Sequence, residues 1–247
     1  MLKQWTDDIY IFGYKNTYLA AYTISTDTIT DIKTNFNTNV TGGARYSDGY
    51  FFVASPQDKI GRVTRTLNYD AQSGNFTAGL IVTGTTSGAK ALILSDADAG
   101  ATGTLTLANI SGTFQNNEAL TDTSTGAATA DGTVAFTYTE ITAAPKAKHI
   151  TVVDTRLIAG NLESDSTAIQ YSAVDDGTNP PFNTWTDSIA STASGTVRYR
   201  NAGDVNVITN LGQNIIVGAD DGKWAFYIDT IDDGAGNLVK VERNVMY

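Results

Sequence analysis

The stretch IVTGTTSGAKALIL, Ile81–Leu94, is followed later in the chain by a close copy of itself, ALTDTSTGAATADG, Ala119–Gly132. When Val82 is aligned with Leu120, the two stretches stay in register at a constant spacing of 38 residues. Each copy holds a strand-forming run, a Thr/Ser-Gly turn and a returning run, which predicts two strands joined by a turn. The identical pairs are Thr83 and Thr121, Thr85 and Thr123, Gly88 and Gly126, and Ala89 and Ala127.

Strand signals also dominate the rest of the chain. Runs of four to eight β-branched and aromatic residues recur, whereas frequent Gly, Asn, Asp and Thr interrupt any apolar pattern of helical period. Of the 247 residues 41% are hydrophobic and 10% aromatic, which is enough to fill a real core. We therefore predict an all-β fold.

Four segments outside the repeat share a second pattern, in which an apolar run ends in a small residue and is followed by a polar turn and another strand. The small residues are Gly13, Ala54, Gly160 and Gly218, at spacings of 41, 106 and 58 residues. Removing about 60 residues from the middle interval brings it close to the length of a four-stranded propeller blade. We predict about four propeller-like blades, forming a complete propeller, part of a larger one, or an arc completed by neighbours.

The excess in the middle interval is the stretch that contains the repeat. We predict that residues 71–134 form an inserted small domain of β-sandwich or barrel type, flanked by propeller-like blades in residues 1–70 and 135–247. The strand FTYTEIT, Phe136–Thr142, would complete the second blade after the insertion. Few aromatic residues and many hydroxyl side chains suit the insert to exposure on an assembly better than to catalysis.

Charge and cysteine content exclude several classes of protein. The net charge is −10, from 26 acidic and 16 basic residues without a basic cluster, so we expect no specific nucleic-acid binding. Cysteine is absent, which excludes disulfides and thiolate metal sites. Apolar runs are strand-length, so we expect no membrane segment. The first residues, with Trp5, Asp7 and Asp8, lack the apolar core of a signal peptide, so we expect the chain to begin directly in a strand.

Residues with catalytic or metal-binding chemistry are sparse. His149 is the only histidine and is expected to have a structural role at the start of a strand. Asp96 and Asp98, in SDADAGATGT, have the Asp-x-Asp-x-Gly pattern of a calcium loop, although Asp and Gly are also ordinary turn residues. Whether these two carboxylates bind calcium stays open. No catalytic set is evident, so we expect neither enzymatic activity nor a cofactor.

The three tryptophans are the residues best suited to stacking on sugar rings. Trp224 opens a strand of alternating pattern, which favours a place in a blade core, whereas Trp5 and Trp185 stay open as glycan contacts. An attachment protein would gather such aromatic rings and carboxylates in one concave pocket. An assembly protein would instead spread its contacts over strand edges and loops.

The segment Gly79–Thr133, with its elements VTGTTSGA, DAGATGTLTL, SGTF and NEALT, resembles a module that recurs in structural proteins of tailed bacteriophages. The flanks resemble phage tail-associated β-propellers, in which a strand like TRLIAGN precedes one like IQYSAVDDGTNP. The resemblance implies a virion structural protein of the tail, of nozzle, hub or tail-tip type, whose partners are copies of itself and other tail proteins. The alternative is a glycan-binding or glycan-cleaving propeller that attaches to a host surface glycan.

Overall fold

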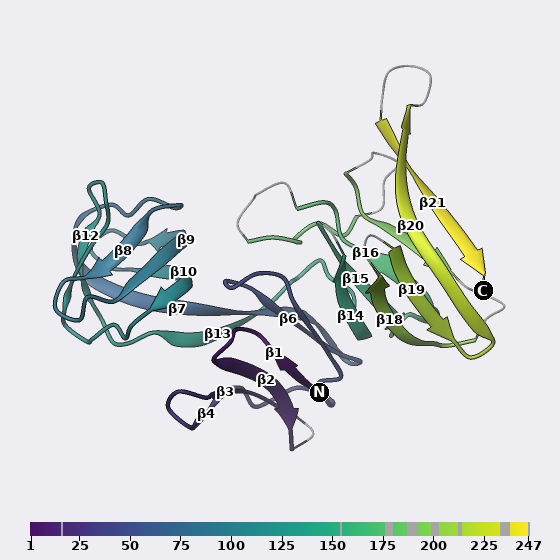
Figure 1. Cartoon of the computed structure of the whole chain (residues 1–247), viewed down its shortest axis with the longest axis horizontal. Helices are drawn as coiled ribbons and strands as arrows, with labels where there is room; N and C mark the ends of the chain where they lie inside the picture. Colours follow the sequence, from purple (N-terminus) through teal and green to yellow (C-terminus); the bar gives the residue numbers. More distant parts are fainter. Residues whose placement is uncertain are drawn as a thin grey trace. The chain divides into compact units, whose positions relative to one another are not determined.

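The computed structural model of the chain is built from β-strands with antiparallel pairing (Figure 1), which confirms the predicted all-β class. In the described part of the chain, no helix is long and apolar enough to span a membrane. The described residues are 1–15, 17–153, 155–175, 180–186, 192–198, 203–211, 214–232 and 238–246.

The chain divides into two compact units. The sheet unit comprises Met1–Arg45, Phe52–Arg62 and Thr139–Tyr247, and the barrel unit comprises Tyr46–Phe51 and Val63–Tyr138. The barrel unit holds the 38-residue repeat and extends beyond residues 71–134 on both sides. The reason is β7 (Asp58–Gly74), a single strand of 17 residues that serves both units, so no loop separates them at this point.

Three sheets of the sheet unit are meanders of four consecutive strands. Successive strands pair antiparallel. Most are joined by short turns, as expected for apolar runs separated by polar turn residues, whereas residues 172–194 connect β16 to β17. The first sheet holds β1 (Leu2–Gln4), β2 (Ile9–Tyr14), β3 (Tyr18–Thr23) and β4 (Thr28–Lys33). Another holds β14 (Ala147–Val153), β15 (Arg156–Leu162), β16 (Asp165–Tyr171) and β17 (Gly195–Arg198). The last holds β18 (Val205–Leu211), β19 (Asn214–Ala219), β20 (Gly222–Asp232) and β21 (Leu238–Met246).

The second sheet in chain order is a meander of the same kind with an interruption. Strands β5 (Gly42–Arg45), β6 (Phe51–Ser55) and β7 pair in sequence, and β13 (Ala135–Glu140) pairs with β7 as the fourth strand. The Ile141 N–H donates to the Ile60 carbonyl, 3.0 Å away, just after β13. The strands of the barrel therefore lie between the third and fourth strands of this sheet in the sequence.

The four sheets pack in chain order. Their first strands contact one another in series, β1 with β5, β5 with β14, and β14 with β18. Between the third and fourth sheets the buried side chains form one hydrophobic cluster, which explains why both sheets are apolar on the faces that meet. Its members are Val153, Ile158, Ile169, Tyr171 and Val197 from the third sheet and Val205, Ile208, Ile215 and Val217 from the fourth.

The barrel unit closes six strands into a ring. The additional strands are β8 (Ile81–Gly84), β9 (Lys90–Asp98), β10 (Gly103–Ser111), β11 (Ala119–Thr121) and β12 (Ala127–Ala130). The pairing order is β7, β10, β9, β8, β11 and β12, and β12 pairs with β7 again. Alternate side chains along each strand point inward and fill the interior. The largest fully buried members are Leu67, Tyr69, Ile93 and Phe114.

The repeat gives this barrel an internal two-fold symmetry. Leu67 lies opposite Leu105 where β7 pairs with β10, and Thr83 lies opposite Thr121 where β8 pairs with β11. Both pairs join residues that are 38 positions apart, so the axis passes through the middle of both strand pairs. The backbone repeats as well. Positive φ angles recur at Ala71 and Asn109 (49° and 50°) and at Gly79 and Asn117 (88° and 62°).

One carboxylate stabilises the turn of each copy, but it comes from different positions. In the second copy Asp122 accepts the N–H groups of Ser124 and Gly126, both at 2.8 Å. The equivalent position in the first copy is Gly84, where an added Cβ would lie 2.4 Å from the Glu118 carboxylate. Glu118 fills that space and accepts the Ser87 N–H at 2.9 Å and the Gln115 N–H at 2.6 Å. A carboxylate therefore stabilises both turns, and it comes from Asp122 in the second copy and from Glu118 in the first.

Candidate functional site

The outer face of the first sheet carries an uncovered group of large apolar side chains, which we call the apolar face: Leu2, Tyr10, Phe12, Tyr22 and Ile29. Strand register brings them together, since Leu2 pairs with Phe12, Tyr10 with Tyr22, and Tyr22 with Ile29. Leu2 is 66% exposed and Ile29 64% exposed. The five side chains line a shallow hollow of about 400 Å³ whose exposed surface is entirely apolar.

The opposite face of the same sheet is buried. Trp5, Ile11 and Leu19 are fully inaccessible to solvent. An antiparallel sheet with one solvated face normally alternates apolar and polar residues along each strand. The first sheet instead has apolar residues on both faces, so its composition suits burial on both sides.

Aromatic rings at the margin of the apolar face are held in place by polar contacts. The Tyr14 ring lies 5.5 Å from the Phe12 ring and 5.2 Å from the Tyr18 ring, measured between centroids. The Tyr14 hydroxyl donates to Asp31, and this hydrogen bond to a carboxylate raises the pKa of Tyr14 to about 12. The Tyr22 hydroxyl donates to Asp27 at 3.0 Å, which also raises its pKa. The rings therefore stay neutral throughout the physiological range.

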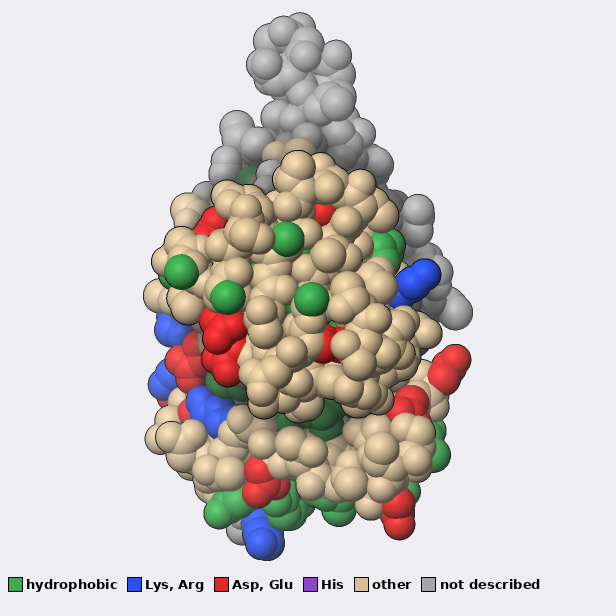
Figure 2. Space-filling view, turned by 90° about the vertical axis from the view of Figure 1, so that its left-hand side faces the viewer, with side chains coloured by type: hydrophobic (Ala, Val, Ile, Leu, Met, Phe, Trp, Pro, Cys, Tyr) green, Lys and Arg blue, Asp and Glu red, His purple; other side chains and the backbone are tan. Residues whose placement is uncertain are grey.

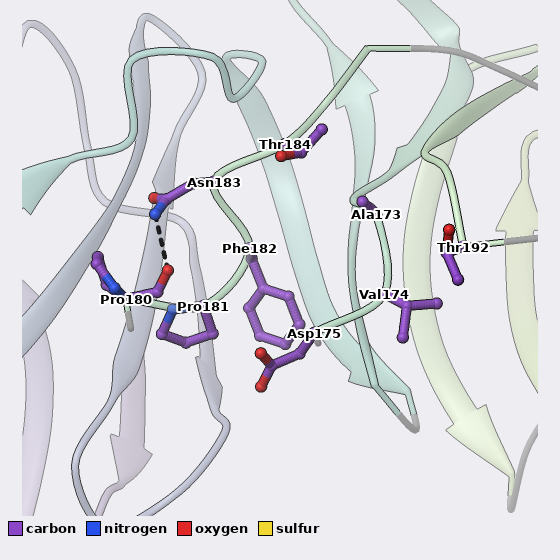
Figure 3. Close-up of a pocket in the computed structure, with 9 residues that line it drawn as sticks. All are labelled: Ala173, Val174, Asp175, Pro180, Pro181, Phe182, Asn183, Thr184 and Thr192. Carbon is purple, nitrogen blue, oxygen red and sulfur yellow. Dashed lines mark hydrogen bonds between the residues drawn. The ribbon is translucent and has the colours of Figure 1, made fainter. Parts of the chain in front are cut away.

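A separate pocket of about 330 Å³ lies in the connection between β16 and β17 (Figure 3). Backbone hydrogen bonds fix its walls, from the Ala173 N–H to the Thr184 carbonyl at 2.9 Å and from the Val174 N–H to the Thr192 carbonyl at 2.8 Å. The Asn183 side-chain amide donates to the Pro180 carbonyl at 2.7 Å. Asp175 is the charged residue of the described lining.

This pocket lacks the chemistry of a sugar site within the described residues. Phe182 is 4% exposed, and its ring lies 5.3 Å from the Phe52 ring. Trp185 is also buried, and its Nε1–H donates to the Phe182 carbonyl at 2.9 Å. Trp5 is buried too, so neither tryptophan presents a ring to solvent. The side chain of Trp224 lies outside the described residues.

The predicted calcium ligands lie at the end of β9 in the barrel. Asp96 accepts the Tyr69 hydroxyl at 2.8 Å, and Asp98 accepts the Gly100 N–H at 2.7 Å. Burial raises the pKa of Asp96, although the Tyr69 hydrogen bond opposes this shift. Within the described ranges no group of three or more His, Asp and Glu side chains could hold a metal ion. Calcium binding at this position is therefore not supported by further ligands in that part of the chain.

His149 lies near the start of β14, opposite Gly160. It is half-buried, and burial lowers its pKa, with Lys148 adding to this shift. Among the described residues, no carboxylate lines the pocket that it shares with Lys15 and Lys148. The histidine is thus neutral at pH 7 and is not brought together with an acid–base partner there.

The barrel surface exposes mainly backbone and uncharged polar side chains (Figure 2). Figure 2 looks onto the side that carries the barrel strands, where tan atoms of backbone and uncharged polar side chains predominate. Hydrophobic side chains are scattered on this side (Figure 2). Among the described residues of the barrel strands, Ile81 is the large hydrophobic residue that is exposed, at 38%. Such a surface fits exposure to solvent.

Sequence reasoning missed the apolar face, although a signal was present. In IYIFGY both alternating sets are apolar, with Ile9 and Ile11 on one face and Tyr10 and Phe12 on the other. A strand of this composition is typical of a sheet that is covered on both faces.

Comparison with known proteins adds no assignment. No family model matches the chain, and no curated protein matches it. Among solved structures it is similar to the computationally designed Ika8 protein, at 13% identity, covering 97% of this chain and 69% of that one, with a TM-score of 0.26.

Proposed function

We propose that the chain is a structural subunit of a tailed-bacteriophage virion, located in the tail, that acts by assembling with copies of itself and with neighbouring tail proteins. Its four sheets would act as propeller blades, and the barrel would be an exposed appendage. The similarity of Gly79–Thr133 to a module of phage structural proteins supports this identity. The four-stranded meanders that pack in chain order support the blade assignment.

The observation that carries an assembly role is the apolar face. Fully burying a side chain such as Leu2 or Ile29 is worth about 1.5–3 kcal/mol. Both are about two-thirds exposed in the isolated chain, and they adjoin the aromatic rings of Tyr10, Phe12 and Tyr22. A contiguous patch of this kind marks an interaction site or an aggregation hazard. An assembly that covers the apolar face prevents aggregation through it and gains the free energy of burying its side chains.

A glycan-directed role has less support from the described residues. Attachment to sugars requires exposed aromatic rings close to carboxylates or amides in a concave site. Trp5 and Trp185 are buried, and the pocket of Figure 3 presents Asp175 without an exposed tryptophan. The hollow of the apolar face exposes only apolar surface, so its described lining offers no polar group that could orient a sugar.

Immunogold electron microscopy of purified particles, with antibodies against the barrel, tests the proposal. The expected result is labelling of the tail, together with detection of the chain in those particles by mass spectrometry. Particles that lack the chain, combined with release of sugar from a host polysaccharide by the purified protein, would replace assembly with the glycan-cleaving alternative.

A further inference from the structure

The packing of the third sheet on the fourth shows which face of a sheet meets its successor. An added Cβ at Gly160 would lie 3.1 Å from Val205 Cγ1 and 3.3 Å from Ile208 Cγ2. Ile158, two residues earlier on β15, belongs to the same cluster between the sheets. Side chains alternate along a strand, so Gly160 and Ile158 share the face that meets the following sheet.

The fourth sheet shows which face meets the preceding sheet. On β19, Ile215 and Val217 belong to the cluster shared with the third sheet. Ile216 and Gly218 therefore point to the other side of the sheet. Gly218 occupies the same place in β19 that Gly160 occupies in β15, so this other side corresponds to the face that meets a following sheet.

That outer face of the fourth sheet carries apolar side chains beside the exposed Thr209, which pairs with Ile216. Val207 pairs with Gly218 and is 48% exposed. Its Cγ1 would lie 2.7 Å from an added Cβ at Gly218, so its side chain lies over the glycine. Ile216, on the same face, is partly exposed. We call these residues, Val207, Ile216 and Gly218, the trailing face.

The apolar face of the first sheet is the matching partner by register. On β2, Gly13 is the small residue, and an added Cβ there would lie 3.0 Å from Val40 Cβ, on the covered side. Phe12 and Tyr10 lie one and three residues before Gly13, as Val217 and Ile215 lie before Gly218. The apolar face is thus the face that would receive a preceding sheet.

We propose that the trailing face of a second copy of this chain packs on the apolar face, head to tail, and that two copies close into a ring of eight sheets. The inference rests on the proposed assembly function and names its first partner. Each copy carries both complementary faces, so the same contact forms twice and the ring closes without a free end. Two copies are favoured because propellers contain about four to eight blades, which three copies of four sheets would exceed.

The contact continues the packing already present between the third and fourth sheets. It joins apolar side chains on both sides, which is the composition of that internal interface. Since each copy carries a net charge of −10, repulsion opposes association and salt screens it. Dimerisation is therefore expected to strengthen as ionic strength rises.

Analytical ultracentrifugation of the full chain tests the proposal. The wild type should sediment as a species of twice the 26.2 kDa chain mass. Ile29→Glu and Val207→Glu should each weaken dimerisation at least about 100-fold, because a carboxylate would be buried without a partner. Ile81→Glu, on the barrel, is the matched control and should not affect it. Circular dichroism verifies folding, and Leu2→Glu replaces Ile29→Glu if that variant does not fold.

Mixing the two variants distinguishes head-to-tail packing from symmetric pairing of like faces. Ile29→Glu retains an intact trailing face and Val207→Glu an intact apolar face, so their mixture should regain a dimer through one good interface. A wild type that is monomeric at about 100 μM, or a dimer that resists Val207→Glu, would overturn the proposal. A monomeric chain that is nevertheless present in particles would leave the tail assignment standing, whereas absence from particles would refute that assignment alone.

Discussion

Within the ring of the barrel each of the six strands is hydrogen-bonded on both edges, whereas the first of the four packed sheets leaves one apolar face open to solvent. Both regions are built from similar short antiparallel strands. The barrel satisfies its strand edges within itself, because β12 returns to β7. The packed sheets have no such closure on the side of the first sheet, so their apolar residues remain available for a partner.

The difference separates two sources of stability. The barrel buries its core through contacts within one chain, so its unfolding should not depend on protein concentration. A face that is covered by a second copy contributes stability only when that copy is bound. If the two regions are independent in this way, a change in one should leave the stability of the other unaffected.

Truncating the centre of the barrel core should have the largest effect. Leu67→Ala and Leu105→Ala should each lower the free energy of unfolding of the barrel by about 3 kcal/mol, since both side chains are fully buried. Their positions are related by the internal axis, so the two losses should be similar. Hydrogen exchange of β8–β12 measures the change. Tryptophan fluorescence reports Trp5, Trp185 and Trp224, all in the sheet unit, and should be unaffected. A parallel loss of fluorescence would show that the regions unfold together.

Neutralising the buried carboxylate of the first turn should cost less. Glu118→Gln should destabilise the barrel by about 2 kcal/mol at pH 7, because hydrogen bonds to a charged acceptor are lost. Burial raises the pKa of Glu118, but the N–H groups of Ser87 and Gln115 outweigh it and leave the pKa lowered. The contribution is therefore present above the unfolded pKa of about 4.3 and disappears as pH falls through the folded value. Urea unfolding at pH 7 and at pH 3 measures this. An equal loss of unfolding free energy at pH 7 and at pH 3 would show that the charge of Glu118 does not contribute to stability.

Backbone conformation at the repeated left-handed positions should have a smaller effect. Gly79→Ala and Asn117→Ala should each cost about 1 kcal/mol, because a left-handed conformation disfavours a residue with Cβ that lacks a local polar group. Asn117→Gly should be nearly neutral, since the first copy already uses glycine there. Thermal unfolding of the barrel compares the three variants. A large cost for Asn117→Gly would mean that the side chain, rather than φ, matters.

Removing the barrel should affect the packed sheets least. The Thr66 and Thr137 hydroxyls lie 2.8 Å apart on β7 and β13, so an Asn-Gly turn can replace residues 67–136 without moving the strand ends. We expect a soluble, β-rich protein whose tryptophan unfolding midpoint equals that of the full chain. Aggregation of the deletion variant alone would show that the sheets need the barrel.

The all-β class could be predicted from strand composition, and the four small residues of the second pattern do lie in the second strands β2, β6, β15 and β19. Their local pattern suffices because a hairpin is formed by neighbours in sequence. The start of the repeat was harder to recognise. Leu67 and Leu105 occupy equivalent places, but few identities surround them, and their pairing depends on contacts between distant strands.

Only part of the candidate site could be predicted from the sequence. The alternation in β2 indicates that both faces are apolar, but only the packing order shows which face the chain leaves open. Glu118, in NEALT, has the sequence context of a surface residue, and its burial depends on the absence of a side chain at Gly84 in the other copy. Compensation of this kind joins positions far apart in sequence and carries no local signal.

A two-fold axis within one chain indicates an origin by duplication. Each copy supplies three strands, and three strands of this length leave two edges unpaired. The ancestral unit would therefore have needed a second molecule of itself, and fusion of the two genes would have made that partner permanent. The difference between Asp122 in one copy and a glycine with a distant glutamate in the other then dates from after the duplication, since two copies must exist before they can differ. In this view the barrel descends from an obligate homodimer.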